Sequence, residues 1–349
     1  MSITIKDVAL AAGVSVATVS RAMNGHANVT PATSARILEV MRELRYTPHG
    51  AAQSLVTRRT QTIGVLLPDM HGEFFSELIR GIDAAARIQG LHLLLSSSHG
   101  DLSDTSAALK MMRGRVDGLL IMAPTATAQF YVEQLHESLP TVLINAPAGD
   151  TPQARVAIDN YGGAVQMVRH LHRGGRKRIA FISGPNNNHD AAERLRGFRE
   201  ALSALEPDYL PPVMHGDFNE PSGFRAGQQV VALTERPDAV FAANDMMAIG
   251  CLLALSEAGV RVPEDVAVVG YDNIPTARFV RPALTTVAVP ITDLGTVALE
   301  RLASVIENPT KAQGQETLLR TQLVVRSSCG AAQVSAGSLR MLRSGGRPA

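Results

Sequence analysis

The sequence predicts a small all-α helix-turn-helix head, followed by an α/β core of two doubly wound subdomains built on parallel sheets. Two patterns predict this division, since residues 1–60 carry short amphipathic helices whereas residues 61–330 alternate apolar strands with helical stretches. Charge gives a third indication. Residues 1–60 hold seven Lys and Arg against three acidic residues, although the net charge of the 349-residue chain is only +1. A basic head of this kind is expected to contact a polyanion.

The composition excludes several other classes of protein. Hydrophobic residues make up 45% of the chain, which is too many for a disordered protein. No apolar run reaches the roughly 18 residues of a membrane helix, and residues 1–12 lack the apolar stretch of a signal peptide. Cys251 and Cys329 form neither a disulfide framework nor a Cys-x-x-Cys metal site. We therefore expect a cytoplasmic protein without a membrane segment.

In the head, a hydroxyl residue precedes each of three short helical patterns. Thr4 and the acid three residues later form a capping box, Ser15 precedes a helix over 16–23, and Thr30 precedes a proline at the first helical position. Gly13 accepts the positive φ of a tight turn between the first two helices. Three short helices with such a turn predict a helix-turn-helix.

The second predicted helix has an apolar face and an opposite face of small and polar residues. Small side chains would let that face enter the major groove, where Arg21 can reach guanine O6 and N7 or a phosphate. Thr18 and Asn24 are polar enough for contacts with the DNA backbone. An ordinary surface helix with one exposed arginine remains the alternative. The candidate DNA-binding residues here are Thr4, Ser15, Val16, Ala17, Thr18, Ser20, Arg21 and Asn24.

Ten apolar runs in the core have the length of strands and alternate with helical patterns. Most are continuously apolar, as expected for parallel strands covered by helices on both faces. The alternation predicts doubly wound α/β topology, and ten strands suggest two similar subdomains rather than one sheet. The expected strands are 63–68, 91–96, 118–122, 141–145, 155–158, 178–183, 239–243, 266–270, 284–289 and 321–326.

Polar side chains follow several of these strands at their carboxyl ends, where ligands bind in doubly wound folds. Asp69, Asn145, Asn244 and Asp272 occupy such positions, and Arg194 follows an Asn-rich loop. These groups suit a polyhydroxylated ligand, because each hydroxyl both donates and accepts hydrogen bonds. Candidate aromatic faces for its ring are Phe74, Phe75 and Phe218. We therefore expect a ligand cleft between the subdomains.

A structural alternative remains open for strand-end Asp and Asn. Such side chains often cap the helix that follows, by accepting hydrogen bonds from its first backbone amides. Asp159, Asn160 and Asp245 fit this alternative best.

The head resembles the DNA-binding domain of the LacI/GalR family of bacterial transcriptional regulators. The motifs are Ile5–Ala9, Gly13–Arg21, Asn24-Gly25, Leu44–Pro48 and Ala51–Leu55. The resemblance implies that Val16, Ala17 and Arg21 read bases. It also implies that residues 51–57, which include Ala52, form a hinge helix on operator DNA. Leu55 would then wedge into the central minor-groove step and bend the duplex.

The core resembles the effector-binding part of the same family, which is similar to periplasmic sugar-binding proteins. Gly270–Asn273 and Leu284–Val287 carry this resemblance, which extends over residues 3–330. It implies that Arg194, Asn244 and Asp272 hold the effector. The implied pocket-lining residues are Asp69, Phe74, Phe75, Asn145, Phe218 and Ile291. Asn145, Phe218 and Ile291 depart from the residues of the family's galactoside-binding repressor, so the ligand need not be a galactoside.

The resemblance also implies a division of the chain. Residues 1–48 would be the helix-turn-helix domain, 49–60 the hinge helix and linker, and 61–330 the effector-binding and dimerisation core. The expected core subdomains are an N-subdomain of about 61–160 and 291–318 and a C-subdomain of about 161–290 and 319–330. The tail, residues 331–349, is expected to be disordered. It lacks the leucine heptads of a tetramer, which favours a homodimer.

No G-x-S-x-G, H-E-x-x-H, P-loop or strand-following G-x-G-x-x-G motif occurs, so we expect no catalytic residue, cofactor or metal. The resemblance implies a repressor of carbohydrate-utilisation genes that a small sugar-like inducer releases from a pseudo-palindromic operator. A corepressor-dependent regulator that binds a purine or another small metabolite is one alternative. A soluble sugar-binding module is an alternative from another class.

Overall fold

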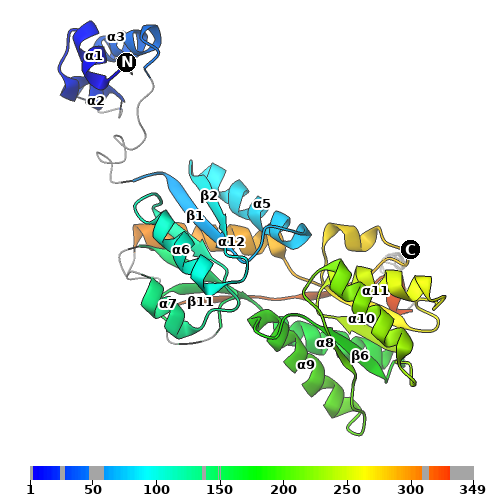
Figure 1. Ribbon diagram of the computed structural model, residues 1–349. Coiled ribbons are helices and arrows are strands. Elements are labelled where there is room, and N and C mark those ends of the chain that lie inside the picture. Colours follow the sequence, from blue (N-terminus) through cyan, green and yellow to red (C-terminus); the bar gives the residue numbers. More distant parts are fainter. Residues whose placement is uncertain are drawn as a thin grey trace, which may run out of the picture. The chain divides into compact units, whose positions relative to one another are not determined.

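The computed structural model describes residues 3–23, 28–46, 59–135, 139–147, 149, 151–308 and 314–330. The chain divides into two units, residues 1–60 and 61–349, each of which has its own packed interior (Figure 1). Asn24, the expected hinge helix over 51–57 with Ala52 and Leu55, and the tail from residue 331 lie outside the described residues.

The first unit is a three-helix head around a small apolar core. Its helices are α1 (Ile5–Ala11), α2 (Val16–Met23) and α3 (Pro31–Glu43). Val8, Val19 and Ile37 are fully buried, one from each helix. The predicted caps are present, since the Ser15 hydroxyl accepts a hydrogen bond from the Thr18 amide at 3.1 Å and the Thr30 hydroxyl accepts one from the Thr33 amide at 3.3 Å. The predicted helix-turn-helix head is confirmed.

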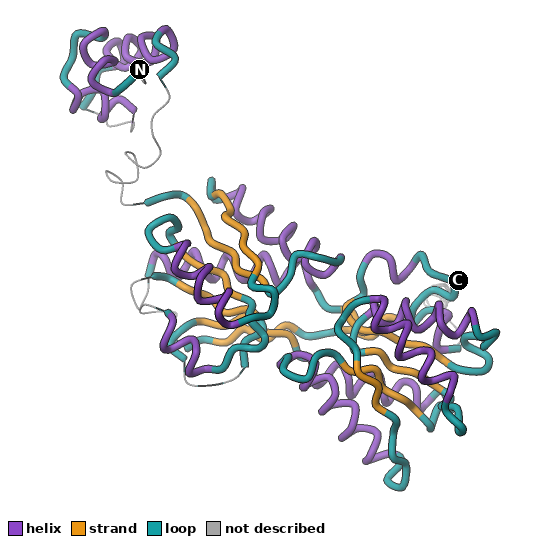
Figure 2. Tube along the Cα trace, in the orientation of Figure 1, coloured by secondary structure: helices purple, strands orange, loops and turns teal. Residues whose placement is uncertain are grey.

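The second unit contains two sheets with helices on both faces (Figure 2). The first sheet has the strand order β11-β5-β4-β3-β1-β2, with all strands parallel. It forms the N-subdomain with its covering helices. The elements of the N-subdomain are β1 (Thr62–Leu67), α5 (Glu73–Ile88), β2 (His92–Ser97), α6 (Leu102–Met112), β3 (Gly118–Ile121), α7 (Ala128–Gln134), β4 (Thr141–Ile144), β5 (Ala154–Ile158), α12 (Ile291–Glu307) and β11 (Glu316–Leu319).

The second sheet has the order β12-β10-β9-β8-β6-β7, and its helices complete the C-subdomain. The pairing of β10 with β12 is antiparallel and the others are parallel. The elements are α8 (Asn160–Arg173), β6 (Ile179–Ser183), α9 (His189–Leu205), β7 (Val213–His215), α10 (Glu220–Ala232), β8 (Ala239–Ala242), α11 (Asp245–Glu257), β9 (Ala267–Asp272), η1 (Pro275–Arg278), β10 (Thr285–Ala288), β12 (Gln322–Val324) and η2 (Ser327–Cys329).

The predicted doubly wound α/β core is confirmed, with two strands that the apolar pattern missed. All residues of β6 and β9 are buried, which explains why their apolar runs were visible in the sequence. In contrast, β7 has three residues, and β11 alternates exposed and half-buried positions. Both strands lie at a sheet edge, where a neighbour covers only one side of the strand. The apolar run of such a strand is too short or too polar to be recognised in the sequence.

The polypeptide connects the two subdomains in three places within the described ranges. It passes from β5 to α8 through Asp159, from β10 to α12 through residues 289–290, and from β11 to β12 through residues 320–321. The three connections place the carboxyl ends of strands from both sheets at one boundary. Ligands of doubly wound folds bind at such strand ends.

Two glycines allow α5 and α12 to pack closely on one face of the first sheet. A Cβ atom on Gly81 would lie 2.1 Å from the carbonyl oxygen of Thr292, and one on Gly295 would lie 2.4 Å from that of Leu78. Neither backbone oxygen can move without displacing its helix. The pair of glycines therefore sets the distance between these helices.

We predict that Gly295→Ala lowers the free energy of unfolding by about 1–3 kcal/mol, because the added methyl group must push the two helices apart. Ser304→Ala is the matched control, since residue 304 is exposed on the same helix. The control should change stability by less than about 0.5 kcal/mol. Urea unfolding measures both, and equal midpoints for the two variants would contradict the close packing.

Candidate functional site

The outer face of α2 in the head displays most of the candidate DNA-binding residues. Val16, Ala17 and Arg21 are exposed, whereas Val19 on the opposite side is fully buried. Thr18 and Ser20 are half-buried at the edges of this face. The helix is therefore amphipathic in the way that a groove-binding helix requires, with small side chains and one guanidinium outward.

Thr4 and Ser15 lie at the starts of α1 and α2 rather than on this outer face. Both the amide and the hydroxyl of Thr4 donate hydrogen bonds to Asp7 at 2.8 Å. The hydroxyl of Ser15 lies 2.9 Å from that of Thr18. These contacts position the helix ends, and both residues remain exposed.

A cavity of about 190 Å³ lies between the two subdomains at the carboxyl ends of their strands. Its walls come from residues after β1 and β3 of the first sheet, from residues after β6, β7 and β8 of the second, and from the last residue of β9. The position agrees with the strand-end rule for doubly wound folds. The structure brings together at this cavity Asp69, Phe74, Phe75, Arg194, Phe218, Asn244 and Asp272.

Two residues that the sequence placed in the pocket lie elsewhere. Asn145 is buried behind the cavity, where its amide nitrogen donates to Asp190 at 3.2 Å and its amide oxygen accepts from the Ile158 amide at 3.1 Å. Ile291 begins α12 and lines a separate cavity of about 390 Å³ that also contacts Arg326. Asn145 therefore contacts the cavity wall through Asp190, and neither Asn145 nor Ile291 lines the cavity.

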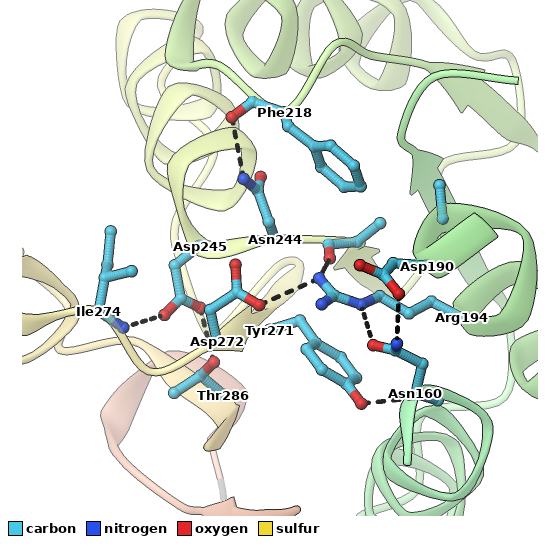
Figure 3. A network of polar contacts seen from close by, with 12 residues as sticks. Asn160, Asp190, Arg194, Phe218, Asn244, Asp245, Tyr271, Asp272, Ile274 and Thr286 are labelled. Carbon is cyan, nitrogen blue, oxygen red and sulfur yellow. Dashed lines mark hydrogen bonds and ion pairs between the residues drawn. The ribbon is translucent and has the colours of Figure 1, made fainter. Parts of the chain in front are cut away.

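A buried ionic network forms the floor of the cavity (Figure 3). Nη1 of Arg194 lies 3.1 Å from Oδ1 of Asp272, and both side chains are at most 6% exposed. The same nitrogen donates to the Ala243 carbonyl at 2.6 Å, and Nε donates to Oδ1 of Asn160 at 2.8 Å. The guanidinium carbon lies 3.9 Å from the ring centre of Tyr271. A charge held by this many partners is fixed in place.

Burial governs the protonation of Asp272. Removal from water raises the pKa of its carboxyl to about 6, the positive charge of Arg194 opposes the shift, and the negative charge of Asp190 adds to it. The contact with Arg194 lacks hydrogen-bond geometry, so Oδ1 of Asp272 has no hydrogen-bond donor among the described residues. A donor group on a ligand would satisfy this buried acceptor.

The backbone is strained at two residues of the cavity wall. Asp272 has φ 103° and Phe218 has φ 61°, in the left-handed region that side chains other than glycine rarely adopt. Gly184 makes room for the ring of Phe218, because a Cβ there would lie 2.4 Å from it. The ring lies 5.9 Å from the Arg194 guanidinium. Tertiary contacts thus hold an aromatic face beside the charged floor.

Phe74 and Phe75 lie on the other side, at the start of α5. Their ring centres are 5.4 Å apart, and the two ring planes are perpendicular at 86°. The pair therefore does not offer two parallel walls to one flat ligand.

Of the adjacent Asn244 and Asp245, Asn244 rather than Asp245 caps the helix that follows. Asn244, which lines the cavity as expected, is also the N-cap of α11 and accepts from the Met247 amide at 2.9 Å. Its amide nitrogen donates to the Phe218 carbonyl at 2.9 Å. Asp245, expected to cap, instead accepts from the Thr286 hydroxyl at 2.6 Å and the Ile274 amide at 2.9 Å. The expected cap at Asp245 is wrong because burial points that side chain toward β10.

Sequence reasoning missed Asp190. Its carboxylate accepts from Asn160 at 2.8 Å and from Asn145 at 3.2 Å, so it joins the C-subdomain to the N-subdomain. Burial raises the pKa of Asp190, with Arg194 opposing the shift. The missed signal was spacing, since Asp190 and Arg194 are four residues apart on α9 and must share one helix face.

The described part of the chain contains no cluster of side chains that could hold a metal ion, no membrane-crossing helix and no disulfide. Its His, Cys, Asp and Glu side chains form no group of three or more that could hold a metal ion. None of its helices is long and apolar enough to cross a membrane. Cys251 and Cys329 are both buried and unpaired with each other.

An exposed small-residue helix in a helix-turn-helix head, joined to a core with a ligand cavity, defines the class of ligand-responsive DNA-binding regulators. Residues 4–49 match the family described as bacterial regulatory proteins, lacI family, and residues 168–329 match the periplasmic binding protein-like domain. The chain belongs to the LacI family of bacterial transcriptional regulators.

Individual relatives support this assignment along nearly the whole chain. Catabolite control protein A of Priestia megaterium is 35% identical over 89% of this chain and 94% of the relative. The ribose operon repressor of Escherichia coli strain K12 is 36% identical over 93% of this chain and 99% of the relative. The solved lac repressor dimer bound to operator and the anti-inducer ONPF matches with a TM-score of 0.86 and 28% identity, over 95% of this chain and all of that one. Two of these three relatives are named as repressors.

We predict that Asp272→Asn makes the protein more stable above pH 7. The native pKa of about 6 exceeds the ordinary value of 3.8, so the folded state binds this proton more tightly than the unfolded chain. Stability from this group therefore falls as pH rises from about 4 to about 6 and stays low above that range. The upper limit of the gain is about 3 kcal/mol at pH 8, at 1.36 kcal/mol for each pKa unit.

Thermal unfolding at pH 5 and pH 8 measures this effect. The stability of Asp272→Asn relative to the wild type should increase more at pH 8 than at pH 5. Asp265→Asn is the control, because half-buried Asp265 is hydrogen-bonded to Arg261 and its pKa is lowered to about 2. That control should gain no stability at pH 8. An Asp272→Asn variant with the pH dependence of the wild type would contradict the assigned cost of the buried carboxylate.

Proposed function

We propose that the protein is a homodimeric repressor whose two heads read the half-sites of a pseudo-palindromic operator, and that a small sugar-like inducer in the cavity releases it. Two features together carry this proposal. The exposed face of α2 suits the DNA major groove, and the core contains a cavity with Arg194 and Asp272 at its base. The two-fold symmetry of a dimer matches that of a palindrome. Two relatives, a ribose operon repressor and an operator-bound lac repressor dimer, support it.

On DNA, Val16, Ala17 and Arg21 would contact base edges from the exposed face of α2. Ser20 belongs to the same face, and Thr18 and Asn24 would contact the sugar-phosphate backbone. Thr4 and Ser15 complete the proposed set of DNA-binding residues. Arg21 would supply the discriminating contact, since a guanidinium pairs with guanine O6 and N7. Ala52 would belong to the hinge helix, and Leu55 would unstack the central base step.

Ligand binding would change the relative arrangement of the N-subdomain and the C-subdomain. Three contacts join them around the cavity: the Thr276 amide donates to Glu73 at 2.8 Å, the His189 amide donates to the Pro124 carbonyl at 3.0 Å, and Asn145 donates to Asp190. A ligand held by both subdomains favours one of their arrangements over the other. Differential affinity of about 1–3 kcal/mol would change operator affinity 5–150-fold, and DNA would change ligand affinity equally.

A binding selection tests the proposal: the purified protein is mixed with fragments of the source genome at physiological salt without added ligand, and the bound fragments are sequenced. One enriched pseudo-palindrome supports a repressor that small molecules release. Enrichment only after a small-molecule extract is added would instead establish a corepressor. Absence of enrichment under both conditions would contradict sequence-specific DNA binding.

We predict that Arg21→Ala weakens binding to the selected operator by about 1–3 kcal/mol at fixed salt and relaxes sequence preference at one position. Arg36→Ala is the matched control, because it removes the same charge from an exposed position on α3. Fluorescence anisotropy measures both affinities. Equal losses for the two variants would show that Arg21 contributes only general attraction for phosphate.

We predict that Arg194→Lys abolishes the response of operator binding to a deproteinised bacterial extract while leaving affinity without extract unchanged. Lysine keeps the positive charge but cannot reach Asp272, Asn160 and the Ala243 carbonyl together. Arg196→Lys on the exposed face of the same helix should respond as the wild type does. A normal response from Arg194→Lys would remove Arg194 from the effector site.

A further inference from the structure

The charges on the walls of the cavity are unbalanced. Four carboxylates line it, from Asp69, Asp190, Asp217 and Asp272. Among the described lining residues, Arg194 supplies the sole Lys or Arg side chain. A ligand in this cavity is therefore surrounded by more negative than positive charge.

The positive charge of Arg194 is already committed inside the protein. It lies 3.1 Å from Asp272, and its remaining contacts include the Ala243 carbonyl and the Asn160 amide oxygen. Asp190 is the second buried carboxylate near it. The floor thus holds two carboxylates against one guanidinium and has no spare cation for an incoming anion.

Helix N-termini, which often bind anions through free amides, are also occupied here. Asn188 accepts from the Ala191 amide at 3.0 Å on α9, Asn219 accepts from the Ser222 amide at 2.9 Å on α10, and Asn244 caps α11. All three cap residues line the cavity. The partial positive charge of each helix start is therefore directed to a side chain of the protein itself.

Each of these helices, and α5 as well, also carries an acid in its first turn. The acids are Glu73, Asp190, Glu220 and Asp245. A carboxylate in the first turn offsets the positive end of the helix dipole. The acids of the chain thus weaken the attraction of these helix starts for a phosphate.

The size and polarity of the cavity further restrict which ligands can bind. Its 190 Å³ lies below the roughly 300 Å³ at which sites for drug-sized molecules begin, so a compact ring fits. Beside its ion pair with Arg194, Oδ1 of Asp272 has room to accept a hydrogen bond from a ligand donor such as a hydroxyl or an N–H. Phe218 offers a ring face beside it.

We infer that the cavity selects a compact effector without negative charge, a neutral or amine-bearing ring with several hydroxyl groups, and excludes phosphorylated and carboxylated sugars. This inference rests on the proposed function, because it takes the cavity to be the effector site. A phosphate group would meet Asp272 and Asp190 with no free cation to compensate, and like charges repel strongly where water is excluded. Asp217 adds a further carboxylate at the exposed rim, where Nη2 of Arg225 lies 3.5 Å from its Oδ2 and offsets part of its charge.

The first test separates a deproteinised bacterial extract on an anion-exchange resin and adds each fraction to the wild-type protein on its selected operator. The unretained fraction, which holds neutral and cationic compounds, should change operator affinity. Activity confined to the retained, anionic fraction would overturn the inference while leaving the ligand-responsive repressor intact. Activity in neither fraction would instead remove the proposed ligand response itself, and the inference with it.

The second test compares the active compound with its phosphate ester. The ester should compete at least about tenfold more weakly, as expected for like charges about one ring apart. Asp217→Asn should reduce the difference in affinity between the ester and the parent compound, and the reduction should be larger at low salt. Asp208→Asn is the matched control, since Asp208 is exposed on the same subdomain and does not line the cavity. Equal competition by ester and parent compound would overturn the inference.

Discussion

The buried pairing of Arg194 with Asp272 is the interaction on which the rest of the core depends. The guanidinium joins α9 to the carboxyl end of β9, to the start of α8 through Asn160 and to the end of β8 through a carbonyl oxygen. Removing Arg194 would leave the buried carboxylates of Asp272 and Asp190 without compensation, which costs about 3–5 kcal/mol. The pair is consequently a constraint on fold and cavity alike.

The same network explains how one cavity can influence the arrangement of two subdomains. Asn160 links Arg194 to Asp190, and Asp190 accepts from Asn145 at the end of β4 in the N-subdomain. A raised pKa at Asp272 shows that the fold keeps a carboxylate where it is costly. Groups kept at such a cost belong to functional sites more often than to purely structural ones. The acids and Asn caps at the surrounding helix starts shape the same site electrostatically.

Much of the fold could be predicted from the sequence because its causes are local. Buried parallel strands such as β6 and β9 are continuous apolar runs, and the hydroxyl caps of the head act within three residues. The edge strands β7 and β11 could not be found in this way, since one is short and the other half exposed. The roles of Asn244 and Asp245 were also out of reach, because adjacent polar residues at a strand end look alike until the packing orients them.

By itself the sequence determined the helix-turn-helix head, the strand–helix alternation of the core and the family, together with seven residues that do line the cavity. Periodicity, caps and turns are set by neighbours a few residues apart, so they can be read along the chain. Only the tertiary structure decided that Asn145 lies behind the cavity, that Ile291 faces another one and that Asp190 joins the subdomains. The contacts of Asp190 join residues 30 to 45 apart in the chain, Ile291 lines its cavity with residues such as Glu77, and no local pattern encodes such contacts.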